Sequence, residues 1–155
     1  MPPKSSAENA EKTLVRYWFE EVWNQGREEL IDELLSPEVP VNGLAEGNTV
    51  LHGHAEFRTF YRNIRGTLPD IHLTIEDLIS EGEKIAVRLS VVGTHMGDAL
   101  APATGRAVKF MVLVMARVTN GRIAEAWNSI DQLGLLTQIG ALPAPGTDRF
   151  LKRPA

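Results

Sequence analysis

The sequence predicts an α+β fold in which helices cover one face of an antiparallel sheet. Two observations favour this fold class. Up to about residue 64, apolar residues recur at the three- and four-residue spacing of amphipathic helices. After Pro69 the pattern changes to the two-residue alternation that is typical of strands. With 155 residues, the chain is long enough for one domain with a sizeable core.

Three helices are predicted in the first half of the chain, at residues 7–25, 27–35 and 55–64. Gly26 ends the first helix and Pro37 stops the second. Residues 38–48 read as a loop with a short strand at 39–42. The apolar stripes of the three helices comprise Leu14, Val15, Trp18, Phe19 and Val22, then Leu30, Ile31, Leu34 and Leu35, and then Phe57, Phe60, Tyr61 and Ile64.

Four strands are predicted in the second half, at residues 71–79, 84–94, 108–118 and 122–130. Residues 81–83 and 119–121 read as hairpin turns, the second through the strong Asn120-Gly121 signal. A longer connection, residues 95–106, joins the middle two strands. We therefore expect a single domain over residues 7–142, with tails at 1–6 and 143–155.

Composition excludes several classes of function. The chain has no cysteine, so disulfides, thiolate metal sites and a cysteine nucleophile are ruled out. The formal net charge is −4, and no Lys/Arg cluster indicates a nucleic-acid partner. No apolar run approaches the roughly 20 residues needed to span a bilayer. The N-terminal residues lack the apolar core of a signal peptide, so we expect a cytoplasmic protein.

The last strand ends in a carboxylate, Asp131, and an apolar helical pattern follows at once. Two-residue alternation places Trp127 and Asp131 on the same face of that strand. An acid beside an apolar wall loses hydration, which suits it to proton transfer. The alternative is that Asp131 only caps the following turn, since Asp is a good N-cap.

Both faces of the 108–118 strand are largely apolar. One face has Lys109, Met111, Leu113, Met115 and Arg117, and the other has Phe110, Val112, Val114 and Ala116. If helices cover one face and a second subunit covers the other, the protein is a homodimer. A single helix layer that leaves a few valines exposed fits the sequence equally well.

Several short segments resemble the SnoaL-like polyketide cyclases and ester cyclases, which belong to the ketosteroid isomerase and nuclear transport factor-like superfamily. The resemblance extends from the first helix to Gly140. The segments that carry it are Pro69-Asp70, Gly93-Thr94-His95 with Gly97, Asn120-Gly121-Arg122-Ile123, and Trp127 with Asp131, Leu133-Gly134 and Gln138. It implies a cone-shaped fold, with a strongly curved sheet wrapped over three helices around an internal cavity. It also implies that Asp131 is the acid/base of an intramolecular aldol closure.

The predicted cavity lining is mostly apolar with a few polar groups, as in many small-molecule sites. Its candidate substrate-binding residues are Trp18, Asn42, Phe57, Tyr61, Met111, Leu113, Met115, Arg117 and Trp127. Arg117 could pair with Asp131 or Glu125, or lie at a solvated rim. His95 could be a catalytic proton shuttle near neutral pH, or an edge residue bonded to neighbouring backbone. Asn42 could bond a substrate carbonyl or serve only as a turn residue.

These observations favour a cofactor-free enzyme that binds a small apolar or polycyclic ligand and performs an aldol-type cyclisation or an isomerisation. No flavin, nicotinamide or phosphate motif is present. His52 and His54 have poor spacing for a metal, so no metal site is expected. Two alternatives remain open: an epoxide hydrolase on the same fold, using Arg117 and Asp131, and a non-catalytic ligand-binding or dimerisation module.

Overall fold

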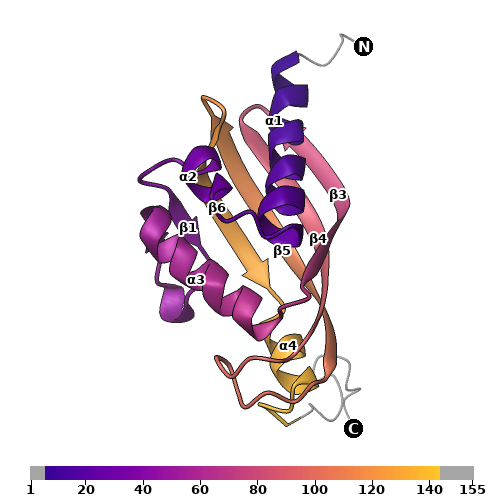
Figure 1. Ribbon diagram of the computed structural model, residues 1–155. Helices are drawn as coiled ribbons and strands as arrows, with labels where there is room; N and C mark the ends of the chain where they lie inside the picture. The colour runs from indigo at the N-terminus through magenta and orange to yellow at the C-terminus, as the bar shows by residue number, and fades with distance from the viewer. Residues whose placement is uncertain (1–5, 144–155) are drawn as a thin grey trace, which may run out of the picture.

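The computed structural model describes residues 6–143, and Figure 1 shows how their elements follow one another. The tails expected at 1–6 and 143–155 lie, except for Ser6 and Pro143, outside the described residues. The elements are α1 (Ser6–Tyr17), the π-helix η1 (Trp18–Asn24), α2 (Leu30–Leu34), β1 (Pro40–Asn42), the 3₁₀ turn η2 (Glu46–Asn48), β2 (Leu51–His52), α3 (Gly53–Thr67), β3 (His72–Glu81), β4 (Lys84–Thr94), β5 (Ala107–Thr119), β6 (Arg122–Ile130) and α4 (Gln132–Gln138).

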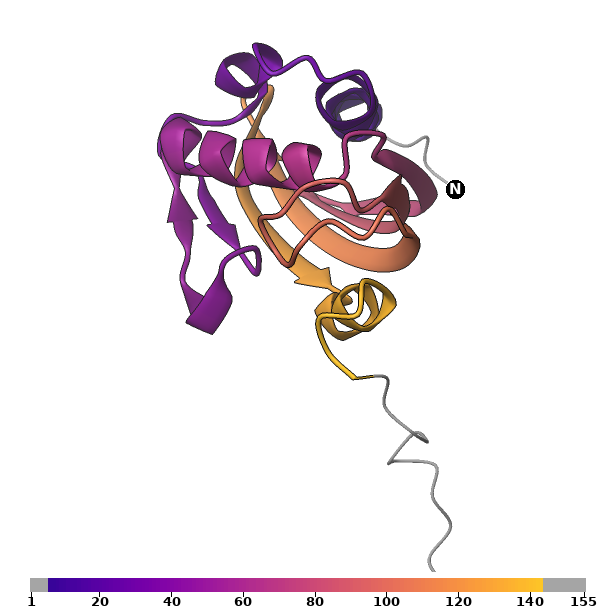
Figure 2. The same ribbon diagram turned by 60° about the horizontal axis from the view of Figure 1, so that its bottom comes forward.

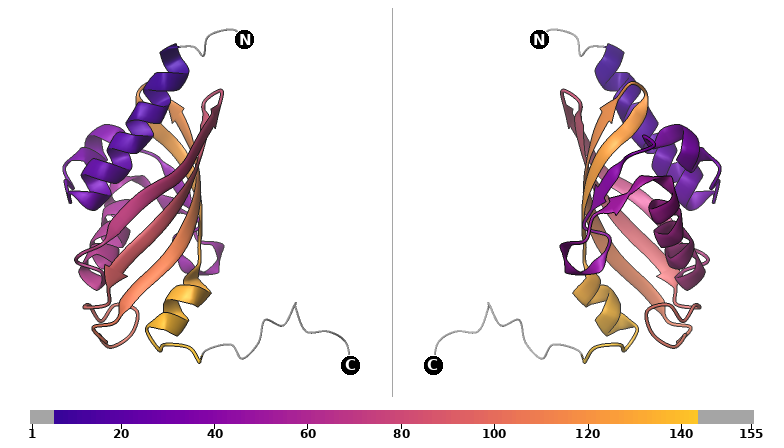
Figure 3. Two further views of the ribbon diagram at one scale, coloured as in Figure 1. Left: turned by 90° about the vertical axis from the view of Figure 1, so that its right-hand side faces the viewer. Right: turned by 90° about the vertical axis from the view of Figure 1, so that its left-hand side faces the viewer.

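The strands form one six-stranded sheet in the order β2-β1-β6-β5-β4-β3. β3 to β6 make an antiparallel meander, whereas β1 joins β6 in parallel and pairs with β2 in antiparallel fashion. The sheet is curved, and α1, α2 and α3 lie on one side of it (Figures 2 and 3). The predicted α+β class with helices on one face of the sheet is confirmed.

The first predicted helix is one continuous segment in the structure, but its second half is the π-helix η1. Carbonyls at a helix end lack an intrahelical partner and need another donor. The Tyr61 hydroxyl, from α3, donates to the carbonyl oxygen of Val22 at 2.6 Å. Arg65, one turn further along α3, donates in the same way to the carbonyl of Trp23. These bonds fasten η1 to α3.

Aromatic rings fill the space between the helices and the sheet. The ring centroids of Trp18 and Phe57 are 5.5 Å apart, and those of Trp23 and Tyr61 are 5.0 Å apart in an edge-on arrangement. All four side chains are buried. On the sheet side, alternate β4 residues complete this core, namely Ile85, Val87, Leu89 and Val91.

Side-chain amides engage strand backbone that neighbouring strands leave unpaired. Asn24 donates to the carbonyl of Leu73 at 3.0 Å and accepts from its N–H at 2.7 Å, on the edge strand β3. Gln138 of α4 makes the same paired contact with Lys109 of β5, at 2.8 Å for both bonds. Because these groups are used internally, the edges are protected from pairing with another chain at these points.

Candidate functional site

The register of the strands decides which side chains face the helices. Met115 pairs with Trp127, and Ala116 pairs with Ala126 and with Ile85. Ala116 and Ile85 are buried, so their side of the sheet is the one that packs against the helices. Met115 and Trp127 therefore point to the opposite side, which we call the outer face.

The outer face carries most of the strand residues that the sequence assigned to the cavity. Met111, Leu113 and Met115 lie there and are 45%, 47% and 42% exposed. An open hollow of about 600 Å³ crosses this face over four strands. The outer-face residues around it are Asp77, Ile79, Ala86, Arg88, Leu113, Met115, Trp127 and Ser129, and Val87, Val114 and Asn128 stand between them in the strands with their side chains on the helix-facing side.

The predicted single lining is therefore divided between the two sides of the sheet. Trp18, Phe57 and Tyr61 are buried in the helix–sheet core, whereas Leu113 and Met115 lie on the outer face. The expectation that they line one cavity is wrong. The reason is that both faces of β5 are apolar, and a shift of one residue exchanges the two faces completely.

Asp131 is the N-cap of α4. Its Oδ1 accepts from the backbone N–H of Gly134 at 2.9 Å, and its own N–H donates to the carbonyl of Met111 at 3.1 Å. The capping interpretation is confirmed. The side chain is exposed, so the expected loss of hydration beside Trp127 is wrong. Within the described residues its Oδ2 has no hydrogen-bond partner, and a role for this oxygen in proton transfer stays a prediction.

Arg117 pairs across the strands with Glu125, with 3.6 Å between Nη2 and Oε2. This is one of the pairings that the sequence left open. The neighbouring Lys84 places its Nζ 5.8 Å from the ring centroid of Trp127, a cation–π contact. The charged groups around the outer-face hollow are therefore engaged with each other or with a ring.

His95 follows β4 and is completely buried. Its Nδ1 lies 3.0 Å from the hydroxyl of Thr104 and accepts from the N–H of Thr104 at 3.3 Å. The interpretation as an edge residue bonded to neighbouring backbone is confirmed. Its Nε2 is buried and has no partner among the described residues. A proton-shuttle role stays a prediction.

The segment around His95 is tightly tied, which explains two of the motifs. Asp70 accepts at 2.7 Å from both the hydroxyl and the N–H of Thr94, and these bonds hold the pKa of the Asp70 carboxyl below its usual value. A Cβ on Gly97 would lie 2.3 Å from the carbonyl oxygen of Gly66, so only glycine fits there. The motifs fasten β4 and its following loop to the end of α3.

Asn42 uses its side-chain amide to join two strands. Its Nδ2 donates to the carbonyl of Ala126 at 3.1 Å, and its own carbonyl accepts from the Asn128 amide at 3.0 Å. Asn128, on the helix-facing side of β6, is partly buried. Asn42 pairs in register with Trp127, on the other side of the sheet from Asn128, and a substrate contact by Asn42 stays a prediction.

Sequence reasoning missed a set of partly buried apolar side chains on the helix-facing side. They come from α3, β5 and β6, and comprise Phe60, Ile64, Phe110, Val114 and Ile130. The β5 members belong to the even-numbered face, which was left out of the predicted lining. Their alternation was visible in the sequence, but nothing in it indicated that this face was the inner one.

Two further classes of site find no support in the described residues. Between Ser6 and Pro143, no group of three or more His, Asp or Glu side chains is arranged to hold a metal ion. Nor does this part of the chain contain a helix long and apolar enough to cross a membrane.

The curved sheet with helices on one side is the fold of the nuclear transport factor-like proteins. A Burkholderia pseudomallei protein described as NTF2-like shares this fold, with a TM-score of 0.71, 20% sequence identity and coverage of 84% of this chain and 98% of that one. The model of the SnoaL-like polyketide cyclase family matches residues 13–139. The chain therefore belongs to the SnoaL-like polyketide cyclase family, and the predicted resemblance is confirmed.

Three other solved structures share 28% identity with the chain. TsrD from Streptomyces laurentii has a TM-score of 0.76 and covers 90% of this chain and 99% of its own. IdmH from Streptomyces antibioticus, provisionally named a polyketide cyclase, has a TM-score of 0.73 with 84% and 98% coverage. A Bacillus cereus protein with the same provisional name has a TM-score of 0.76 with 92% and 89% coverage. No curated protein matches the sequence.

Proposed function

We propose that the protein is a cofactor-free enzyme that cyclises or isomerises a small apolar or polycyclic carbonyl compound, with Asp131 as its acid/base. The observation that carries the proposal is the position of Asp131. It stands between the last residue of β6 and α4, and α4 and the 95–106 loop lie at that end of the sheet (Figures 1 and 3). Membership of the polyketide cyclase family supports the reaction class.

The substrate surface that we propose lies on the helix-facing side of the sheet. The backbone of Asp131, with φ −70° and ψ 72°, is not that of a strand, so the alternation that puts Trp127 on the outer face ends before Asp131, and the proposal requires its carboxylate to point to the helix-facing side. Phe60, Ile64, Phe110, Val114 and Ile130 are only partly buried there, so they offer apolar area to a ligand. α3, which carries the first two, passes in front of β6 near the carboxyl end of that strand (Figure 1). An apolar lining with few polar groups is the usual composition of a small-molecule site.

The chemistry assigned to Asp131 needs no electron carrier. Oδ2 removes a proton from a carbon next to a carbonyl, and the resulting enolate carbon forms a bond to a second carbonyl carbon. The oxygen of that second carbonyl then takes the proton back from Asp131. The carboxylate is regenerated, and no group is oxidised or reduced. Acid/base help of this kind contributes about 10²–10⁴-fold in rate.

Asp131→Asn tests this role. Asn keeps the oxygen that accepts from Gly134, so the cap survives, but it cannot accept the substrate proton. Turnover of polycyclic β-keto esters, followed by absorbance, is expected to fall at least about a hundredfold. Asp98→Asn is the matched control, because Asp98 likewise accepts a backbone N–H, that of Ala103 at 2.7 Å, and is exposed.

The outcomes separate the open alternatives. Turnover retained in Asp131→Asn would remove Asp131 from the mechanism. Turnover of epoxides alone by the parent protein would favour the hydrolase. Tight binding of apolar ligands without turnover of either class would favour a non-catalytic binding module. The pairing of Arg117 with Glu125 counts against the hydrolase, since that reading needs Arg117 beside Asp131.

We also propose that the protein is a homodimer through the outer face. Ile79, Leu113 and Met115 expose apolar area on that face, which the three N-terminal helices leave uncovered (Figure 3). Contiguous apolar surface of this kind marks interaction sites. The charges beside it are paired within one copy, as in Arg88–Asp77 at 2.7 Å, so two copies can meet without repulsion. The cytoplasmic location expected from the sequence stays a prediction.

A further inference from the structure

Asn128 is a polar residue whose strand neighbours on the helix-facing side are apolar. It stands in β6 between Ala126 and Ile130 on that side, and Val114 of β5 is its partner across the strands. The Asn128 side chain is partly buried, as are those of Val114 and Ile130. A ligand on the proposed substrate surface would therefore touch the amide of Asn128 as well as apolar side chains.

The backbone of β1 fixes the orientation of this amide. Nδ2 of Asn128 donates to the backbone carbonyl of Asn42 at 3.0 Å. A carbonyl only accepts hydrogen bonds, so the nitrogen of the amide, and not its oxygen, must face it. The end of β1 is held close at this point, because Gly43 lies against the carbonyl oxygen of Asn128 and a Cβ on Gly43 would collide with it. The amide oxygen, Oδ1, therefore points away from the carbonyl of Asn42.

Oδ1 of Asn128 is not used by these contacts. Asn24 and Gln138 use both the nitrogen and the oxygen of their amides to bond strand backbone. Asn128 uses only its nitrogen, and among the described residues its Oδ1 has no hydrogen-bond partner. An amide that served only to join two strands would gain from bonds at both atoms. The oxygen of Asn128 is thus an acceptor that a ligand can use.

We propose that Asn128 binds and orients the substrate, and that its Oδ1 accepts a hydrogen bond from a substrate hydroxyl group. This rests on the proposed function, since it places the substrate on the helix-facing side of the sheet. It narrows the substrate class to polycyclic carbonyl compounds that carry a phenolic or enolic hydroxyl. When a ligand covers a polar atom without bonding it, that atom loses its contact with water and gains nothing in return. A hydroxyl at this place is therefore favoured over an ether.

The position of Asn128 also indicates the size of the substrate. Asn128 belongs to β6, and Asp131 directly follows that strand. At a rise of about 3.3 Å per residue, their Cα atoms lie on the order of 10 Å apart, which about two fused six-membered rings would span. A hydroxyl bound at Asn128 thus places the far ring of such a compound at Asp131.

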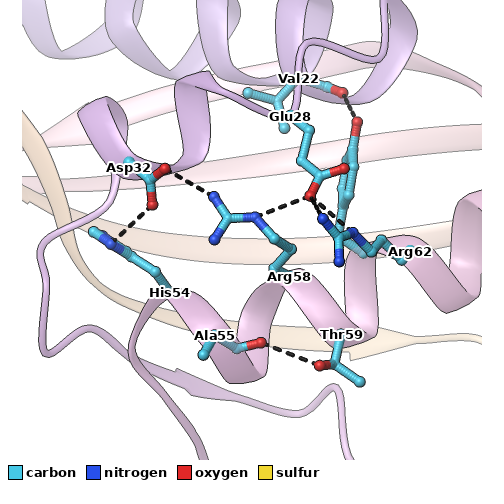
Figure 4. Close-up of polar contacts among 9 residues, drawn as sticks. Val22, Glu28, Asp32, His54, Ala55, Arg58, Thr59 and Arg62 are labelled. Carbon is cyan, nitrogen blue, oxygen red and sulfur yellow. Dashed lines mark hydrogen bonds and ion pairs between the residues drawn. The ribbon is translucent and has the colours of Figure 1, made fainter.

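α3, which supplies two of the apolar side chains of this surface, is fixed by ion pairs on another of its faces. Arg58 bonds Glu28 and Asp32, at 2.9 Å in both cases (Figure 4). Arg62 bonds the same Glu28 at 2.6 Å (Figure 4). The part of the surface that α3 supplies is therefore in place before a ligand binds, which lowers the entropy cost of binding.

The test compares 2-naphthol with its methyl ether, 2-methoxynaphthalene, which cannot donate a hydrogen bond. The Kd of each is measured by isothermal titration calorimetry for the parent, Asn128→Leu and Asn63→Leu. The parent is expected to bind 2-naphthol at least about fivefold more tightly than the ether, which is the lower end of the cost of an unbonded polar atom.

In Asn128→Leu this preference should disappear, because leucine has nearly the volume of asparagine but no acceptor. A preference caused by the size of the methyl group would instead persist in that variant. Asn63→Leu is the matched control, since Asn63 is exposed on α3 and the same change there should leave the preference as it is in the parent.

A second measurement uses the parent alone. In ¹H–¹⁵N spectra, 2-naphthol should shift the side-chain amide signals of Asn128 more than 2-methoxynaphthalene does. The proposal is overturned if the parent binds the two compounds equally or binds neither, or if Asn128→Leu keeps the preference of the parent. Equal shifts of the Asn128 amide signals would overturn it as well.

Asp131→Asn separates this proposal from the proposed function. That variant keeps Asn128, so it should retain the preference for 2-naphthol even where turnover is lost. A preference for 2-naphthol together with full turnover in Asp131→Asn would remove the acid/base role of Asp131 and leave the Asn128 contact standing. Loss of turnover in Asp131→Asn, with no preference in the parent, would remove the Asn128 contact and leave the acid/base role.

Discussion

Leu113→Asp on the outer face is expected to dissociate the proposed homodimer. Leu113 is 47% exposed in one copy, so about half of its side chain remains to be buried by a partner. Complete burial of a leucine is worth about 1.5–3 kcal/mol, so the exposed half contributes about 1 kcal/mol per copy. In a two-fold symmetric interface each copy contributes its own Leu113, so the substitution removes two leucines. The apolar loss is thus about 2 kcal/mol, or roughly thirtyfold in Kd.

The aspartate adds the cost of placing a carboxylate against apolar side chains. We therefore expect the Kd of the dimer to rise at least about a hundredfold in Leu113→Asp. Leu113→Ala separates the two contributions, because it removes only the apolar part. Met96→Asp is the matched control, since Met96 is 57% exposed but lies in the loop after β4, away from the outer face.

Sedimentation velocity at micromolar concentration is the assay. The parent and Met96→Asp should give twice the 17.1 kDa mass of one chain, and Leu113→Asp should give that of one chain. Circular dichroism should be unchanged, because the substituted side chain lies outside the helix–sheet core. A parent protein with the mass of one chain would refute the dimer. A Leu113→Asp variant that stays dimeric would refute the use of this face.

The remaining predictions concern stability. Asn24→Ala removes both hydrogen bonds between the Asn24 amide and the backbone of Leu73. At roughly 1 kcal/mol per bond, the free energy of unfolding in urea should fall by about 2 kcal/mol. A fall below about 0.5 kcal/mol would contradict this. Hydrogen bonds from Thr94 hold the pKa of Asp70 below its usual value, so the stability that Asp70 contributes is complete above the ordinary carboxyl pKa and is lost as pH falls from there through the lowered pKa of the folded state. In Asp70→Asn the free energy of unfolding should fall less steeply at acid pH than in the parent. An equally steep fall would contradict the role given to Asp70. Burial raises the pKa of Tyr61, so stability should fall above about pH 10, and Tyr61→Phe should remove that alkaline loss; persistence of the loss would point to another group.

Much of the fold could be predicted from local pattern. The strands at 84–94 and 122–130 agree closely with β4 and β6, because alternation and the Asn120-Gly121 turn are properties of neighbouring residues. The π-helix η1 could not be predicted, since its helical spacing looks ordinary in sequence. The short strand β2 was also missed, because two residues carry no period of their own.

In the candidate site too, contacts between residues close in sequence could be predicted and contacts between distant residues could not. Asp131 was identified with both of its possible roles, and the structure confirms the capping bond, which joins residues only three apart. The partners of His95 and Arg117 are set by the 95–106 loop and by strand register, which local pattern does not report. Asn128 shows this most clearly, because the carbonyl that orients its amide belongs to Asn42 in another strand, 86 positions earlier in the chain.

The sequence by itself determined the fold class, the order of most of the elements and the carboxylate at the end of β6. Only the tertiary structure decided which face of the sheet is inside. Both faces of β5 are apolar, so either Leu113 or Val112 could have faced the helices with similar burial of apolar area. The choice follows from register and from the packing of α3 and η1 on one side. Such long-range contacts form only when the whole chain is folded.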